Sequence, residues 1–125
     1  MTDTILIVDD DEAYAKSIAA LLRQHGLEAW HTISGETALD MLSRRQFDAV
    51  LTDIYMPHRD GLELLHAITQ LYRGMPVIGM TANNSELWPV IDRIFRLIGG
   101  VALLRKPVSE SELLTVLTTL PRRQS

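Results

Sequence analysis

The chain has 125 residues, the size of one compact domain, and 46% of them are hydrophobic, so a core can form without disulfides or structural metals. It contains no cysteine, which excludes disulfides, thiolate metal ligands and a cysteine nucleophile. The formal net charge of −4 argues against nucleic-acid binding by this domain, because nucleic acids carry dense negative charge.

Membrane insertion is also disfavoured. No apolar run approaches the ~20 residues that a membrane-spanning helix requires, and the polar, acidic start of the chain differs from the basic start of a signal peptide. We therefore expect a cytoplasmic protein that does not associate with membranes.

Apolar runs of strand length alternate along the chain with amphipathic segments of helix length. The first run is continuous and rich in β-branched side chains, which is typical of a strand buried on both faces. The pattern predicts strands at residues 5–8, 28–31, 49–52, 77–80 and 101–104. It predicts helices at residues 13–25, after the N-cap Ser34, at 61–72, at 85–98 and after the N-cap Ser109.

This strict alternation of strand and helix predicts a parallel sheet with helices on both faces. We expect one domain over residues 1–121, followed by a tail or the start of a linker at residues 122–125. In such a sheet, ligands bind beyond the carboxyl ends of the strands. A functional site is therefore expected among the residues that follow the strands.

Polar residues stand at the carboxyl ends of four predicted strands. They are Asp9, Asp10 and Asp11 after the first strand, Asp53 after the third, Thr81 after the fourth and Lys106 after the fifth. A single aspartate in such a place is usually a helix cap or a turn residue, and Asp11 alone is explained as the cap of the first helix. A lone lysine is usually solvated. It is the combination at one edge of the sheet that points to a site.

The residue types indicate the chemistry of this edge. Carboxylates packed together repel one another at neutral pH and require a cation. Oxygen ligands without histidine or cysteine suit Mg²⁺, which commonly coordinates a phosphate as well. Asp53 can then act as a nucleophile that forms an aspartyl phosphate. Lys106 can neutralise charge on the transferring phosphoryl group, and the Thr81 hydroxyl can donate to a phosphate oxygen.

These residues resemble the receiver domains of two-component response regulators, and the resemblance extends over nearly the whole chain. The matching segments are Ile7-Val8-Asp9-Asp10-Asp11-Glu12, Asp53-Ile54-Tyr55-Met56-Pro57 with Gly61 beyond, Thr81-Ala82, and Lys106-Pro107. The resemblance implies an α/β, flavodoxin-like fold of five β–α units, doubly wound, with a five-stranded parallel sheet of order 2-1-3-4-5.

The resemblance also implies roles for individual residues. Asp53 would be the phosphoacceptor and a Mg²⁺ ligand, Asp10 a direct ligand and Asp9 a partly water-mediated one. The backbone carbonyl of Tyr55 would be a further ligand, and the Lys106–Pro107 peptide bond would be cis. The donor would be a phosphohistidine on a sensor kinase or phosphotransfer protein. Such a domain phosphorylates itself and slowly hydrolyses the product, rather than acting as a turnover enzyme.

The sequence departs from the family pattern in the parts that transmit the signal. Members usually have Tyr or Phe shortly before the lysine, as the aromatic half of a switch with Thr81, and this chain has Leu103 there. The fourth helix contains Trp88-Pro89, and Pro89 either starts this helix or kinks its first turn.

The fourth helix also has two apolar stripes. We expect the first stripe to face the core; it consists of Leu87, Ile91, Ile94 and Ile98. Trp88 and Phe95 form a neighbouring stripe at helical spacing. Either the core buries this second stripe as well, or it is exposed and binds a target protein or a second copy of the chain, together with the fifth strand.

The main alternative to a phosphoacceptor switch is a pseudo-receiver, a docking or dimerisation module that works without phosphate. Leu103 and the unusual fourth helix favour this alternative, and the complete polar set at the strand ends opposes it. A flavodoxin-like cofactor binder or a hydrolase is disfavoured, because the chain lacks a glycine-rich phosphate loop and a serine nucleophile elbow.

Overall fold

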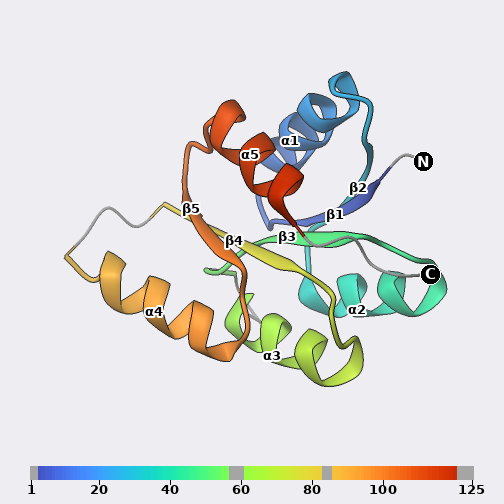
Figure 1. The fold of residues 1–125 in the computed structure, drawn as a ribbon. Helices are drawn as coiled ribbons and strands as arrows, with labels where there is room; N and C mark the ends of the chain where they lie inside the picture. The colour runs from blue at the N-terminus through green and yellow to red at the C-terminus, as the bar shows by residue number, and fades with distance from the viewer. Residues whose placement is uncertain (1–2, 57–60, 83–85, 121–125) are drawn as a thin grey trace.

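A computed structural model describes residues 3–56, 61–82 and 86–120, and Figure 1 shows a three-layer α/β architecture. In these segments, five strands form one parallel sheet in the order β2-β1-β3-β4-β5. The strands are β1 (Thr4–Val8), β2 (Glu28–Thr32), β3 (Ala49–Asp53), β4 (Val77–Thr81) and β5 (Ala102–Arg105). The predicted flavodoxin-like fold and strand order are confirmed.

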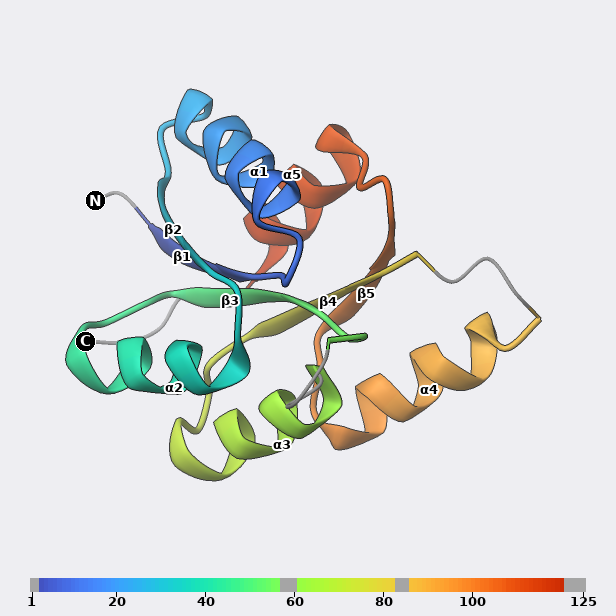
Figure 2. The ribbon, with the colours of Figure 1, turned by 180° about the vertical axis from the view of Figure 1, so that it is seen from behind.

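The helices cover both faces of the sheet. They are α1 (Glu12–Gln24), α2 (Gly35–Arg44), α3 (Gly61–Leu71), α4 (Trp88–Ile98) and α5 (Glu110–Thr119). Helices α1 and α5 lie on one face, and α2, α3 and α4 lie on the other (Figures 1 and 2). None of the helices in the described segments is long and apolar enough to cross a membrane.

Three helices begin at the N-cap residues that the sequence predicts, Asp11, Ser34 and Ser109. Asp11 accepts a hydrogen bond from the Tyr14 backbone N–H at 3.1 Å at the start of α1. Ser34 and Ser109 accept from residues three positions further on, at 3.1 and 3.3 Å, at the starts of α2 and α5. These caps satisfy backbone donors that the first helical turn leaves without a partner.

Two hydrophobic cores lie on opposite faces of the sheet. One packs the inward side chains of α1 and α5 against the sheet, and the other packs those of α2, α3 and α4. Strands β3 and β4 are buried along their whole length, because helices cover both of their faces. On the α5 side, Leu113 is fully buried, and Val116, Leu117 and Leu120 are partly buried against the same core.

The inward face of α4 differs from the prediction. Phe95 is fully buried, and three partly buried residues of α4 pack beside it on the same core: Trp88, Ile91 and Ile98. The exposed stripe consists of Leu87, Val90, Ile94 and Leu97, which are 59%, 53%, 42% and 75% exposed. The expectation that Leu87 and Ile94 face the core is wrong, and burial of Phe95 is the alternative that holds.

Two glycines explain which face of α4 turns inward. A Cβ atom added to Gly79 on β4 would lie 2.9 Å from the Phe95 ring and 2.7 Å from Leu103. A Cβ atom on Gly100, just after α4, would collide with the same ring. The missing side chains therefore leave a space that the Phe95 ring fills, and filling it sets the rotation of the helix about its axis.

Helix α4 begins later than predicted. The prediction starts it at Ser85, which lies outside the described residues, whereas Glu86 and Leu87 form a turn and the helix begins at Trp88. Pro89 stands in the first turn of the helix, where its missing N–H costs nothing, so it starts the helix rather than kinking it.

The orientation of α4 leads to a stability prediction. We expect Phe95→Ala to lower the free energy of unfolding by about 3–5 kcal/mol, because it empties the space between Gly79 and Gly100. We expect Leu97→Ala to change it by no more than about 0.5 kcal/mol, because that side chain is 75% exposed. Urea denaturation of both variants is the measurement. Equal losses would contradict this orientation of the helix.

Candidate functional site

The sheet order brings the predicted polar residues to one edge. Asp53 and Thr81 are the last residues of the adjacent strands β3 and β4, Asp9 follows β1, and Lys106 follows β5. Strands β1, β3, β4 and β5 are consecutive neighbours and run parallel, so their carboxyl ends lie side by side. The polar residues from four strands therefore share one location.

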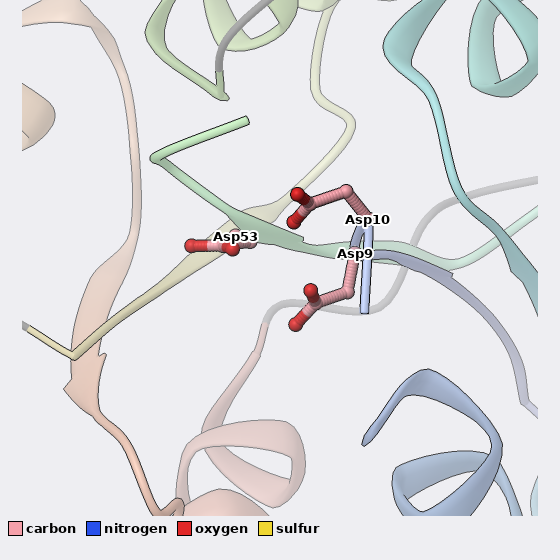
Figure 3. A group of neighbouring side chains, drawn as sticks. All are labelled: Asp9, Asp10 and Asp53. Atoms are coloured by element: carbon pink, nitrogen blue, oxygen red, sulfur yellow. The ribbon is translucent and has the colours of Figure 1, made fainter. Parts of the chain in front are cut away.

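Three carboxylates form the centre of this site. Asp9, Asp10 and Asp53 each have an oxygen within 4.8 Å of an oxygen of the others. Figure 3 shows the side chains of Asp9 and Asp10, from the end of β1, directed to the side on which Asp53 lies. Asp9 is fully buried, Asp53 is 6% exposed, and Asp10 is exposed. The site thus has a buried floor and one acid that faces solvent.

The chemistry of this donor set fits a magnesium ion. Three carboxylates at this spacing repel one another, and hard oxygen donors are what Mg²⁺ prefers. Asp9, Asp10 and Asp53 are the residues that would hold it. The backbone N–H of Tyr55 donates to Asp53 Oδ1 at 3.2 Å, and the ligand role of the Tyr55 carbonyl stays a prediction.

Lys106 is part of the site and not a solvated surface lysine. Its Nζ donates to Asp9 Oδ2 at 2.6 Å and to Asp53 Oδ2 at 3.2 Å, and its side chain is only 17% exposed. Its backbone N–H donates to the Thr81 carbonyl at 2.8 Å, which joins the end of β4 to the end of β5. The Lys106–Pro107 peptide bond is cis, as predicted.

The surroundings shift the pKa values of both partners. Burial raises the pKa of Asp53 above its ordinary value, and the nearby Lys106 charge and the Tyr55 N–H only partly oppose this effect. Burial by itself would lower the pKa of Lys106. Its hydrogen bonds and charge contacts with Asp9 and Asp53 outweigh burial, so the pKa of Lys106 is raised. The ammonium group is therefore held in its charged form.

The two acids at the end of β1 have different surroundings. Asp9 Oδ1 accepts from the backbone N–H of Asp11 at 2.9 Å, and Asp9 Oδ2 accepts from Lys106. Asp10 makes no hydrogen bond or ion pair with the residues that the structure describes. The side chain of Asp11 caps α1, so the interpretation of this residue as a cap is confirmed. Asp10 is thus the acid whose oxygens are available to a metal.

Gly61 explains why the motif around Asp53 includes a distant glycine. Its N–H donates to the Ile54 carbonyl at 3.1 Å, at the start of α3. A Cβ atom at this position would collide with the backbone of Asp53 and Ile54. Only glycine lets the start of α3 approach the phosphoacceptor candidate so closely.

The residues that the sequence associates with switching lie on three neighbouring elements, β4, α4 and β5. Thr81 is fully buried at the end of β4. Leu103 is 6% exposed and packs in the core that also contains Phe95, so it is not a surface residue. Trp88 is partly buried, and the Arg105 guanidinium lies 4.4 Å from the centre of its ring. The switch roles of these residues stay predictions.

Tyr14 is a neighbour of the site that sequence reasoning missed. Its hydroxyl accepts a hydrogen bond from the Val108 backbone N–H at 2.9 Å, and Lys106 Nζ lies 4.8 Å from the centre of its ring. In the sequence, Tyr14 stands out only as one apolar position of the first helix. No local pattern signals a contact with a residue 94 positions away.

The different surroundings of Asp9 and Asp10 support a ranking of metal affinity. We expect Asp10→Ala to weaken Mg²⁺ binding more than Asp9→Ala, because Lys106 already compensates the charge of Asp9, whereas Asp10 has no ion pair among the described residues. Isothermal titration with Mg²⁺ measures both, and Asp40→Ala on the exposed face of α2 serves as the control. Equal losses from the two substitutions would contradict the ranking.

Comparisons with known proteins agree with this geometry. The family model described as response regulator receiver domain matches residues 5–118. The chemotaxis protein CheY4 of Vibrio cholerae superposes with a TM-score of 0.88 at 24% identity, over 97% of this chain and 100% of that one. At this identity the likeness concerns the fold.

Two other solved structures are more similar in sequence. A putative response regulator of Chloroflexus aurantiacus has 29% identity and a TM-score of 0.87, over 96% of this chain and 98% of that one. A CheY-like response regulator receiver domain protein of Methanospirillum hungatei has 30% identity and a TM-score of 0.84, over 94% of this chain and 92% of that one.

Proposed function

This chain belongs to the response regulator receiver domain family, and on that premise we propose that it is a phosphoacceptor switch of a two-component system. In this proposal, Asp53 accepts a phosphoryl group in a Mg²⁺-dependent reaction, and Lys106 and Thr81 assist. The domain occupies residues 1–121, with a tail or linker at residues 122–125, and the range 121–125 lies outside the described residues.

The observation that carries the proposal is the buried contact of the Lys106 ammonium with Asp53 and Asp9, next to the three-carboxylate cluster. A nucleophilic carboxylate needs positive charge around it when a phosphoryl group arrives, since that group brings further negative charge. Lys106 supplies one such charge from within the chain. A bound Mg²⁺ would supply the other and would orient the phosphoryl oxygens.

The chemical step follows from the position of Asp53. A carboxylate oxygen of Asp53 forms a bond to phosphorus while the bond from phosphorus to the imidazole nitrogen of the donor breaks. The imidazole leaves with the electron pair of that bond. Lys106 stays within hydrogen-bonding distance of Asp53 and compensates the charge on the phosphoryl oxygens, and the Thr81 hydroxyl donates to one of them. Attack of water on the product returns Asp53 and phosphate.

We infer that the donor is a phosphohistidine on a sensor kinase or a phosphotransfer protein and that the domain acts in the cytoplasm. Asp10 is the exposed acid of the site, so this edge of the sheet is open to a partner. The domain catalyses only its own phosphorylation and slow dephosphorylation. It is not a turnover enzyme, because its own Asp53 is the acceptor.

The experiment is incubation of the full chain with acetyl phosphate, with Mg²⁺ and with excess chelator. We expect one phosphoryl group per chain in the presence of Mg²⁺ and none with the chelator, measured by intact-protein mass spectrometry. The phosphoryl group should be released by hydroxylamine, which cleaves acyl phosphates. A chain that gains no phosphate under any of these conditions would contradict the proposal.

The pseudo-receiver is the second candidate. Its supporting observation is Leu103, which is buried where the family usually has a switching aromatic ring, so the usual surface signal is missing. A docking module of this kind would bind its partner with the same affinity with or without phosphate. The absence of phosphorylation in the experiment above would favour it.

We expect signalling to reach α4 even without an aromatic residue at position 103. A phosphate on Asp53 would draw the Thr81 hydroxyl toward it, and the chain leads from Thr81 into α4. Hydrogen exchange with and without beryllofluoride, a phosphate mimic, is the measurement. Protection should change within residues 86–98 as well as next to the mimic. Changes confined to residues that touch the mimic would show that α4 does not respond.

An interface on α4 and β5, for a target protein or a second copy of the chain, stays a prediction. The residues expected to form it change. Phe95 and Trp88 belong to the core, so the exposed stripe of α4 defined above takes their place. If this stripe forms the interface, Leu97→Glu should abolish any association seen by analytical ultracentrifugation in the presence of beryllofluoride.

A further inference from the structure

Tyr14 connects two of the three segments that carry the charged groups of the site. It lies in the first turn of α1, shortly after Asp9 and Asp10. Its hydroxyl accepts a hydrogen bond from the Val108 N–H at 2.9 Å, in the segment that follows Lys106. Its ring also faces Lys106, whose Nζ lies 4.8 Å from the ring centre. One side chain therefore contacts both the backbone and the ammonium group of the Lys106 segment.

These two contacts restrict a side chain that would otherwise be mobile. Lysine has a long, flexible stem, and its ammonium group can point its donors in many directions. The face of an aromatic ring attracts an ammonium group, most strongly where water is excluded. The hydrogen bond from the Val108 N–H holds the backbone two residues after Lys106. The ammonium group thus forms ion pairs with Asp9 and Asp53 and a cation–π contact with the Tyr14 ring.

We infer that Tyr14 is a positioning residue for Lys106: its ring holds the ammonium group between Asp9 and Asp53, and its hydroxyl fixes the segment that follows. The inference rests on the proposed function, because positioning matters only if Lys106 acts on a phosphoryl group at Asp53. Among the residues that the structure describes, the Tyr14 side chain makes no hydrogen bond to Asp9, Asp10 or Asp53, and its backbone N–H donates only to Asp11, the cap of α1.

Two substitutions separate the contributions of ring and hydroxyl. Tyr14→Phe keeps the ring under Lys106 and removes the acceptor for the Val108 N–H. Tyr14→Leu removes both and leaves an apolar side chain in the core under α1 and α5. We expect Tyr14→Leu to slow phosphorylation by acetyl phosphate at saturating Mg²⁺ by about three- to thirty-fold. Tyr14→Phe should recover most of the rate.

A double-mutant cycle distinguishes positioning from a general structural role. In a Lys106→Met background, in which we expect slow phosphorylation that long incubations can measure, Tyr14→Leu should cause no further loss. A purely structural role would give the same fold-loss in both backgrounds, and that result would overturn the inference. Tyr72→Leu is the matched control, because Tyr72 packs against the other core, at the end of α3 and far from the strand ends that form the site. It should leave the rate unchanged in both backgrounds.

A measurement without phosphate keeps this inference separate from the proposed function. In ¹⁵N NMR relaxation of the Lys106 ammonium group, we expect an ordered side chain in the unmodified chain and in Tyr14→Phe, and a mobile one in Tyr14→Leu. Equal order in all three would overturn the inference even if phosphorylation proceeds. If the unmodified chain gains no phosphate, the proposed function fails, and the contact of Tyr14 with Lys106 is still decided by NMR.

Discussion

Asp53→Asn is expected to abolish covalent phosphorylation of the chain by acetyl phosphate and Mg²⁺. An amide oxygen carries no negative charge and is a poor nucleophile, so no acyl phosphate can form at this position. The shape of the side chain is kept, and Lys106 retains its contact with Asp9, so the site should remain folded. Intact-protein mass spectrometry should detect one phosphoryl group on the original chain and none on the variant.

The control for this experiment is Asp40→Asn. Asp40 lies on α2 and, among the described residues, its side chain pairs with Arg44 four residues later; both side chains are more than half exposed, at 58% and 75%. This variant should gain one phosphoryl group at the same rate as the original chain. Phosphorylation that persists in Asp53→Asn would refute the assignment of Asp53 as the acceptor.

The same substitution should change how stability depends on pH. Because burial raises the pKa of Asp53 above its ordinary value of 3.8, the folded state holds this proton more tightly than the unfolded state does. Ionisation of Asp53 therefore lowers the stability of the original chain as the pH rises from about 3.8 to the raised folded-state pKa. Asp53→Asn should lack this decrease, which thermal unfolding across that pH range would measure.

Lys106→Met is expected to slow phosphorylation and, at the same time, to strengthen Mg²⁺ binding. Phosphorylation should slow by a factor on the order of 10²–10³, because the ammonium charge near the transferring group is lost. Mg²⁺ should bind more tightly, because Lys106 contacts Asp9 and Asp53 and its charge opposes that of the metal. Acetyl phosphate kinetics and isothermal titration with Mg²⁺ measure these two changes.

The same variant should be less stable in the absence of metal. Asp9 is fully buried, and loss of the cation leaves its charge without compensation, which costs up to about 3–5 kcal/mol. Added Mg²⁺ should restore part of this loss, since it binds the folded state. Lys16→Met is the control: its pair with Glu12 is mostly exposed, so its removal should cost no more than about 1 kcal/mol. Unchanged stability and unchanged Mg²⁺ affinity in Lys106→Met would contradict the role given to this contact.

The pH dependence of the Lys106 contact has the opposite sign from that of Asp53. Its pKa is raised above the ordinary value of 10.5, so the folded state favours the charged ammonium group. This contribution to stability is fully present below pH 10.5 and is lost as the pH rises through the raised folded-state pKa. Lys106→Met should therefore be insensitive to pH in that alkaline range.

The sequence by itself determined the class of the fold and the location of the site. Alternating strands and amphipathic helices bury their apolar faces when the strands form a parallel sheet that the helices cover, which is the α/β class. Because parallel strands end at the same edge, polar residues after four different strands all lie at that edge, whatever their distance along the chain. Caps such as Asp11 and Ser109 are local interactions within a single turn, so they too follow from the sequence alone.

The inward face of α4 was decided by the tertiary structure. This helix has apolar residues at helical spacing on two sides, so the periodicity of the sequence fits either rotation. The choice depends on the space left by Gly79, on the neighbouring strand β4, and by Gly100, just after the helix. The Phe95 ring fills this space, and the exposed stripe of Leu87, Val90, Ile94 and Leu97 consequently faces solvent.

The surroundings of Lys106 were likewise decided by the tertiary structure. The sequence identifies the lysine, but its contact with the fully buried Asp9 spans 97 positions, and the hydrogen bond between Tyr14 and Val108 spans 94. Contacts over such separations follow from the order of the strands and from the way α1 packs on the sheet beside α5. No local pattern encodes them, because their energy is gained only when distant segments are brought together by the packing of the whole core.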